Sequence, residues 1–204
     1  MSNPEKFGVN ASVESLNVVL SAFAERGDVS HALSTLSSFE KFGLKPNADS
    51  YSFAMEVLGK DVNRRKKEYI HRKSNSFVGR AQLDMNIDAA DEILTRMEGE
   101  GIDPTSDIIR NYVELLCLAD EVSTATAVVN DLLQSNQKSV VNNKAIYRVA
   151  IANANLGNFE IARKLAFVMT EPAPNLLRAI GSREQRHNHL ERLRRRDRSE
   201  EVEK

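Results

Sequence analysis

The one strongly basic stretch in the middle of the chain is RRKKEYIHRK, residues 64–73. Its cationic side chains could bind phosphate groups, and the tyrosine among them could stack on a nucleobase. The residues expected to make these contacts are Arg64, Arg65, Lys66, Lys67, Tyr69, Arg72 and Lys73. The pattern leaves a second interpretation open, a solvated loop whose charges bind no ligand.

A second basic stretch lies near the last residue, in LERLRRRDRSEEVEK, residues 190–204. It could bind RNA phosphates or an acidic protein surface, or it could be a disordered extension. Its positive charge is partly balanced by Glu200, Glu201 and Glu203. The residues expected to contact RNA are Arg192, Arg194, Arg195 and Arg196.

Residue sets that could support catalysis or hold a metal are not recognisable. Nucleolytic or base-editing chemistry needs clustered carboxylates or a histidine–cysteine zinc set. Asp88, Asp91 and Glu92 instead have the spacing of a solvated helix face. Cys117 is the single cysteine and the four histidines are scattered, which excludes an internal disulfide and a multi-thiolate zinc site. We expect a non-catalytic protein with no metal, no cofactor and no small-molecule substrate.

Composition and charge are ordinary for a soluble protein. Of 204 residues, 41% are hydrophobic and 28% charged, and no run of about 18 apolar residues predicts a membrane span. The formal net charge is −1, whereas a dedicated nucleic-acid domain is usually clearly basic. Strong non-specific RNA binding by the chain as a whole is therefore not expected. The first residues, MSNPEKFGVNASVESL, show neither a signal peptide nor an arginine-rich presequence.

The elements that must position the basic stretches are amphipathic helices. Apolar residues step by three and four positions, as in Leu16, Val19, Leu20 and Phe23, and strand-like alternation is nearly absent. A second such run follows the sequence AERGD. Gly27 can adopt the left-handed conformation that ends one helix, and the next residue, an aspartate, can cap the following helix. The pattern predicts a helical hairpin.

Two markers show that this hairpin repeats. An alanine early in the second helix recurs at Ala32, Ala90, Ala125 and Ala162, which are 58, 35 and 37 residues apart. A glycine recurs with a matching phase at residues 8, 43 and 101. A period near 35 with two helices per unit predicts an all-α, right-handed α-solenoid of about four repeats. The 58-residue unit carries an insertion of about 23 residues, near residues 61–83, and this insertion contains the basic stretch.

These markers divide the chain into expected segments. Residues 1–12 are expected to end a preceding repeat or to form an N-terminal cap, and residues 178–204 to form a charged helical or disordered tail. The solenoid itself is expected at residues 13–177, with repeats at 13–47, 48–105, 106–142 and 143–177.

The segment VESLNVVLSAFAERGDVSHALSTLSSFEKFGLKPN, residues 13–47, closely resembles a pentatricopeptide repeat, including its closing GLKPN. TRMEGEGIDPT resembles a second closure, with Met97 where the family often has methionine. The later repeats depart from the pattern, and the last is similar to a tetratricopeptide hairpin. The likeness covers roughly residues 8–177, as expected of a short degenerate family member or of the C-terminal part of a longer one.

The resemblance implies RNA binding, because family members mostly bind single-stranded RNA in organelles with one base per repeat. The reading positions lie near the start of the first helix and at the end of the repeat. They correspond to Asn17 and Asn47, a pyrimidine-selecting combination, and to Ser52 and Thr105 in the second repeat. Arg110 and Tyr147, at the first reading position of the last two repeats, do not match the family. One pair discriminates by about 1–3 kcal/mol, so one or two pairs do not select a site in a transcriptome.

The leading hypothesis is a non-catalytic RNA- and protein-binding scaffold of an organellar ribonucleoprotein, most simply the mitochondrial ribosome. RNA, either ribosomal RNA or an organellar transcript, would bind the insertion and the tail, and ribosomal or other ribonucleoprotein proteins would bind the concave face. One alternative is a free organellar RNA-processing or translation factor, and another is a purely protein-binding helical adaptor. The expected location is the mitochondrion, with the plastid as the alternative and no membrane contact.

Overall fold

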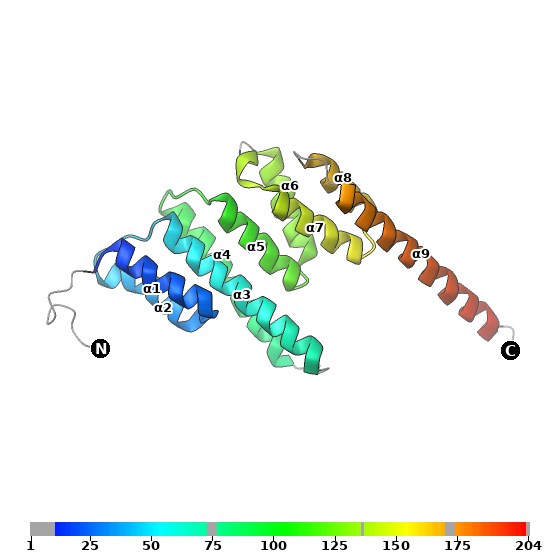
Figure 1. Ribbon diagram of the computed structural model, residues 1–204, viewed down its shortest axis with the longest axis horizontal. Coiled ribbons are helices and arrows are strands. Elements are labelled where there is room, and N and C mark those ends of the chain that lie inside the picture. Colours follow the sequence, from blue (N-terminus) through cyan, green and yellow to red (C-terminus); the bar gives the residue numbers. More distant parts are fainter. Residues whose placement is uncertain (1–10, 73–76, 136, 170–173, 203–204) are drawn as a thin grey trace. The chain divides into compact units, whose positions relative to one another are not determined.

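The computed structural model describes residues 11–72, 77–135, 137–169 and 174–202 (Figure 1). Every regular element within these ranges is helical, which confirms the all-α prediction. None of the helices in the described ranges is both long and apolar enough to cross a membrane. The helices are α1 (Val13–Arg26), α2 (Val29–Lys41), α3 (Ala48–Arg72), α4 (Phe77–Gly99), α5 (Ser106–Leu118), α6 (Val122–Gln134), the 3₁₀ helix η2 (Lys138–Val140), α7 (Asn143–Asn155), α8 (Phe159–Val168) and α9 (Pro174–Val202).

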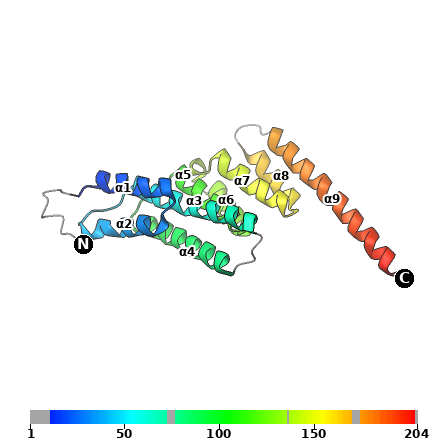
Figure 2. The ribbon, with the colours of Figure 1, turned by 60° about the horizontal axis from the view of Figure 1, so that its bottom comes forward.

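The chain forms two compact units, residues 1–121 and 122–204. In the first unit, α3 packs against α1 on one side and α5 on the other. These three helices make one layer, and α2 and α4, the second helices of their hairpins, make the other (Figure 2). Large side chains between the layers, among them Leu20, Phe39, Tyr51 and Met97, are almost completely buried. Stacked hairpins thereby bury a continuous core.

The turn between α1 and α2 has the conformation that its sequence predicts. Gly27 has a φ of 67°, in the left-handed region, and its N–H donates to the carbonyl oxygens of the last turn of α1. Asp28 caps α2 by accepting a hydrogen bond from the backbone N–H of His31. Gly43 and Gly101 close α2 and α4 with φ values of 66° and 69°. Glycine therefore ends three helices of this unit.

Two glycine replacements should change stability in opposite directions. A Cβ at Gly27 would meet only Lys60 Cβ at 4.0 Å, so Gly27→Ala adds left-handed strain without a clash and should cost about 1–2 kcal/mol. Gly59 lies inside α3 with nothing within 4 Å of an added Cβ, so Gly59→Ala should stabilise the chain by about 0.5–1 kcal/mol. Urea denaturation measures both changes, and shifts of the same sign would contradict the turn geometry.

The inserted residues lengthen the second hairpin. α3 has 25 residues and α4 has 23, against 14 and 13 in α1 and α2. Residues 61–72 and 77–83 of the expected insertion are therefore helical, and the interpretation of this stretch as a loop is wrong. The hairpin is longer because α3 continues through the basic residues instead of ending after about 13 residues as its neighbours do.

In the second unit, α7 and α8 form a hairpin, with α6 against α7 and with α9 against both α7 and α8. α9 begins at Pro174, a position where the missing N–H of proline costs no helical hydrogen bond. Its first half is anchored by Leu176 and Ile180, which are 0% exposed. Up to Val202 the charged tail is a helix.

Candidate nucleic-acid interface

The structure brings together the first expected reading pair, Asn17 and Asn47, which are 30 residues apart in sequence. Asn17 lies on α1, and Asn47 is the residue before α3, which packs against α1. The Nδ2 atom of Asn17 donates a hydrogen bond to Oδ1 of Asn47 at 3.1 Å. Asn47 is exposed and Asn17 is half-buried, so the pair forms a polar link at the surface between two adjacent helices.

A third member of this site, Ser50, was missed by the sequence reasoning. Its hydroxyl donates to Oδ1 of Asn17 at 2.6 Å, and its backbone N–H donates to Oδ1 of Asn47 at 3.0 Å. The backbone N–H of Asn47 donates back to Oγ of Ser50 at 3.1 Å. This is a reciprocal capping arrangement, and the three-residue spacing in NADS, residues 47–50, is the signal that could have revealed it. Ser50 is 0% exposed.

The reading pair offers hydrogen-bond donors to a ligand. Oδ1 of Asn47 accepts from Asn17 and from Ser50, while Oδ1 of Asn17 accepts from Ser50. Within the described part of the chain, Nδ2 of Asn47 has no partner, and Nδ2 of Asn17 uses one of its two protons. An amide nitrogen can donate two hydrogen bonds. The exposed groups therefore suit the acceptor atoms of a nucleobase edge.

The other expected reading positions are not linked in this way. Thr105 is the exposed N-cap of α5, and its side chain accepts from the N–H of Ile108 at 3.3 Å. Ser52 lies half-buried on α3, and among the residues described no hydrogen bond joins it to Thr105. Arg110 on α5 is half-buried, and Tyr147 on α7 is 43% exposed. The base-reading role of these positions stays a prediction.

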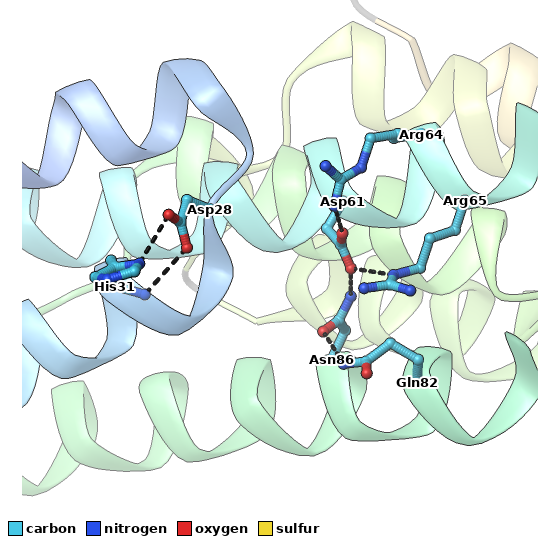
Figure 3. A network of polar contacts seen from close by, with 7 residues as sticks. All are labelled: Asp28, His31, Asp61, Arg64, Arg65, Gln82 and Asn86. Carbon is cyan, nitrogen blue, oxygen red and sulfur yellow. Dashed lines mark hydrogen bonds and ion pairs between the residues drawn. The ribbon is translucent and has the colours of Figure 1, made fainter. Parts of the chain in front are cut away.

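Two of the expected phosphate ligands, Arg64 and Arg65, bind a buried carboxylate on their own helix (Figure 3). Arg64 Nη2 lies 2.5 Å from Oδ1 of Asp61, and Arg65 Nε lies 2.6 Å from Oδ2. Asn86 of α4 donates to the same Oδ2 at 3.0 Å and accepts from Gln82 at 3.5 Å. The Asp61 side chain is 1% exposed, while those of Arg64 and Arg65 are 54% and 38% exposed. The arginines thus stabilise the long hairpin, whatever else they bind.

The remaining residues of the basic stretch cannot be placed in this site. The side chains of Lys66, Lys67, Tyr69 and Arg72, and the whole of Lys73, lie outside the described residues. Their phosphate and stacking contacts stay predictions.

On α9, the described basic residues of the second stretch are exposed. Arg192 and Arg195 are exposed, and Arg194 lies 3.3 Å from Glu191 of its own helix. The side chain of Arg196 lies outside the described residues. An exposed arginine-bearing helix can bind phosphates or an acidic surface, so both interpretations remain predictions.

Asp91, one of the carboxylates on the expected helix face, and Glu100, just after α4, both accept hydrogen bonds from tyrosines. Tyr112 donates its hydroxyl proton to Asp91 at 2.6 Å, and Tyr51 donates to Glu100 at 2.8 Å. Burial and these carboxylates raise the pKa of both tyrosines above the usual value, so they remain donors at neutral pH. Across the described ranges, no group of three or more histidine, cysteine or acidic side chains could hold a metal ion.

Comparison with solved structures shows what kind of fold carries this site. The PPR domain of Arabidopsis thaliana protein-only RNase P 1 (PRORP1), in complex with tRNA, is similar with a TM-score of 0.62 at 15% identity, over 95% of this chain and 92% of that chain. Arabidopsis thaliana nuclear protein-only RNase P 2 (PRORP2) is similar with a TM-score of 0.61 at 14% identity, over 82% of this chain. The match covers 33% of PRORP2, so the chain spans about a third of that protein's length.

Sequence comparison identifies the first hairpin directly. Residues 2–61 match the family model of the pentatricopeptide repeat domain. No curated protein matches the chain in sequence. The matched residues include Asn17, Asn47 and Ser50, whose contacts link α1 to α3. Residues 2–61 thus have the sequence pattern of the pentatricopeptide repeat domain, and the helical-hairpin fold continues in the described residues beyond them, as in the similar PPR domain.

Proposed function

We propose that this chain is a non-catalytic scaffold that binds single-stranded RNA through the Asn17–Asn47 pair. The observation that carries the proposal is the 3.1 Å hydrogen bond between these side chains, which places two amide groups at one surface point. The pair presents N–H donors there, and unstacked bases of single-stranded RNA expose acceptor atoms on their edges. A single site of this kind can hold one base.

The number of linked pairs favours a scaffold over a factor that selects a transcript by itself. One base contact discriminates by about 1–3 kcal/mol, a factor of roughly 5–150. Selecting one site among the many in a transcriptome needs more than this factor. We therefore propose that the chain is built into a larger organellar ribonucleoprotein, most simply a mitochondrial ribosome, with a plastid particle as the alternative.

The basic helices support additional contact with the RNA backbone. Arg64 and Arg65 keep part of their side chains exposed while they neutralise Asp61. On α9, Arg192, Arg194 and Arg195 are exposed as well. Each phosphate contact with single-stranded RNA adds about 0.7 to the slope of log affinity against log salt. Since the net charge of the chain is only −1, such contacts would be local to these two helices.

The role of the reading pair can be tested by changing one amide donor into an acceptor. The ligands are three single-stranded RNA 12-mers, made of U, of C and of A. Asn47→Asp should alter the order of their affinities, because the carboxylate still caps the helix but lacks the N–H donors of Nδ2. Fluorescence anisotropy with the full chain measures the affinities.

The matched control is Asn158→Asp. Asn158 is the N-cap residue of α8, the second helix of its hairpin, so the same change in charge and chemistry occurs at a helix end that holds no reading position. The control should leave the order of affinities as it is in the unmodified chain. An identical order in both variants, or no binding of any 12-mer by the unmodified chain, would contradict the proposed RNA-binding role.

The scaffold assignment has its own test. Affinity purification of the tagged chain from organelles in mild salt should recover ribosomal RNA and ribosomal proteins. Recovery of the chain alone would contradict the scaffold role. It would not test the proposal that the Asn17–Asn47 pair binds RNA.

A second candidate is an RNA-processing factor that acts together with a nuclease supplied by another protein. The observation that favours it is the similarity to the tRNA-bound PPR domain of PRORP1, which extends over most of both chains. Competition against a bound 12-mer tests this role. The concentration of tRNA that displaces the 12-mer should be much lower than the concentration of ribosomal RNA fragments that does so. Equal displacement by both RNAs would leave the scaffold as the better assignment.

A further inference from the structure

We infer that Ser50 is a positioning residue that fixes the hydrogen-bonding polarity of the Asn17–Asn47 pair, so that both amides present N–H donors to the RNA base. The inference rests on the proposed function and extends it from the two reading residues to a buried third residue. Ser50 itself is 0% exposed, so it cannot contact an RNA base directly. Its effect must therefore be transmitted through the asparagines.

The polarity of the network is set by two backbone N–H groups, which can only donate. The N–H of Ser50 points at one end of the Asn47 amide at 3.0 Å, so that end must be the oxygen. The N–H of Asn47 points at Oγ of Ser50 at 3.1 Å, so this hydroxyl accepts there and must direct its own proton elsewhere. Two acceptors lie within reach of this proton, Oδ1 of Asn47 at 3.0 Å and Oδ1 of Asn17 at 2.6 Å.

The constraint then passes to Asn17. The Ser50 hydroxyl proton has its shorter contact, 2.6 Å, with Asn17, so the Asn17 atom at that position is the oxygen. The nitrogen of Asn17 is consequently the atom that faces Oδ1 of Asn47, at 3.1 Å. An asparagine amide that is held on one side only can exchange its oxygen and nitrogen by rotation. The hydroxyl of Ser50 holds the second side of Asn17.

Removing this hydroxyl should affect the choice of base more than the fold. In Ser50→Ala, the backbone N–H at position 50 still donates to Asn47, so the cap of α3 persists. The oxygen of Asn17 loses its donor, so the Asn17 amide is held only by its contact with Oδ1 of Asn47 and can rotate away from the orientation in which it presents its N–H donor. The site then accommodates bases of different edge chemistry and discriminates less among them.

The chain contains a matched control in α1. Ser15 occupies the same third position of a capping box as Ser50, with its Oγ accepting from the N–H of Ser12 at 2.9 Å and its N–H donating to Oγ of Ser12 at 3.2 Å. That box includes neither Asn17 nor Asn47. Ser15→Ala thus removes an equivalent hydroxyl from an equivalent cap while it leaves the Asn17–Asn47 pair intact.

The test compares the unmodified chain, Ser50→Ala and Ser15→Ala in binding to the 12-mers of U, C and A. We expect the ratio between the weakest and the tightest dissociation constants to be about 5 or more in the unmodified chain and in Ser15→Ala. In Ser50→Ala the ratio should fall to within about twofold of one. A ratio that stays unchanged in Ser50→Ala, or falls equally in Ser15→Ala, would overturn the inference.

A second measurement separates this inference from the RNA-binding proposal. In ¹⁵N-edited NMR spectra of the free chain, the Nδ2 protons of Asn17 should have chemical shifts displaced from those of an unstructured asparagine, and in Ser50→Ala these signals should broaden or move towards the unstructured positions. Unchanged Asn17 amide signals in Ser50→Ala would overturn the positioning role whatever the RNA result. Absence of RNA binding by the unmodified chain would instead overturn the proposed function.

Discussion

Replacing Arg64 and Arg65 together with alanine is expected to lower the free energy of unfolding by about 3–5 kcal/mol. The reason is the carboxylate of Asp61, which is 1% exposed and is held by both arginines. Without them, the negative charge remains buried, and among the described residues of α4 the Asn86 amide donates to it. Urea denaturation followed by circular dichroism measures the loss.

The control adds Asp61→Asn to the double variant. A neutral amide needs no cation and can still interact with Asn86, so most of the lost stability should return. Failure of this third change to restore stability would show that the arginines act through contacts other than the buried carboxylate.

The acidity of Asp61 gives a further check on the same cluster. Burial raises the pKa of this carboxyl, but the hydrogen bonds from Arg65, Asn86 and Arg64 outweigh burial and hold the pKa below its usual value. Since the folded pKa is the lower one, the carboxylate contributes its full stability above the unfolded pKa of about 3.9 and loses it as pH falls through the folded pKa. Melting temperatures measured between pH 6 and pH 2.5 should fall less steeply in Asp61→Asn than in the unmodified chain.

This cluster also affects how RNA binding at the basic stretch can be tested. Neutralising Arg64 and Arg65 alone removes a structural ion pair together with two candidate phosphate ligands, so a weaker affinity would have two causes. In the Asp61→Asn background the structural requirement is absent. A change of RNA affinity upon neutralisation in that background reports on the phosphate contacts alone.

The local pattern of the chain was sufficient to predict the first hairpin and its turn. Helical spacing of the apolar residues, the glycine at 27 and the capping aspartate at 28 act through neighbours in sequence. The resemblance to the pentatricopeptide repeat, carried over by the register of the repeat, also implied that Asn17 and Asn47 form a pair, and the structure joins them by a hydrogen bond. These features depend on short-range chemistry and on the regular length of one repeat.

Two kinds of feature could not be predicted from the sequence. Some depend on contacts between helices, and others on a residue that takes a backbone conformation usually adopted by glycine. No local pattern marks Asp61 as buried, and only the packing of α4 beside α3 shows that it is. In the turn after α5, Asp120 takes a φ of 67°, the conformation that glycine adopts at residue 27. Ser50 carries no chemistry that marks it until its distances to both asparagines are known.

The second large effect is expected in α9, where Ile180→Ala should lower the free energy of unfolding by about 2–5 kcal/mol. Ile180 is 0% exposed and lies in the half of α9 that packs against α7 and α8. Truncation to alanine leaves a cavity there and weakens the attachment of the helix. Thermal unfolding of the full chain measures the loss.

Leu190→Ala is the matched control, because Leu190 lies on the same helix but is 54% exposed. Its replacement should change stability by less than about 0.5 kcal/mol. Equal losses in the two variants would show that α9 is anchored along its whole length, and the arginines near its end would then be structural residues. A loss confined to Ile180→Ala means that the first half of α9 holds the helix, while Arg192, Arg194 and Arg195 remain available to bind RNA phosphates.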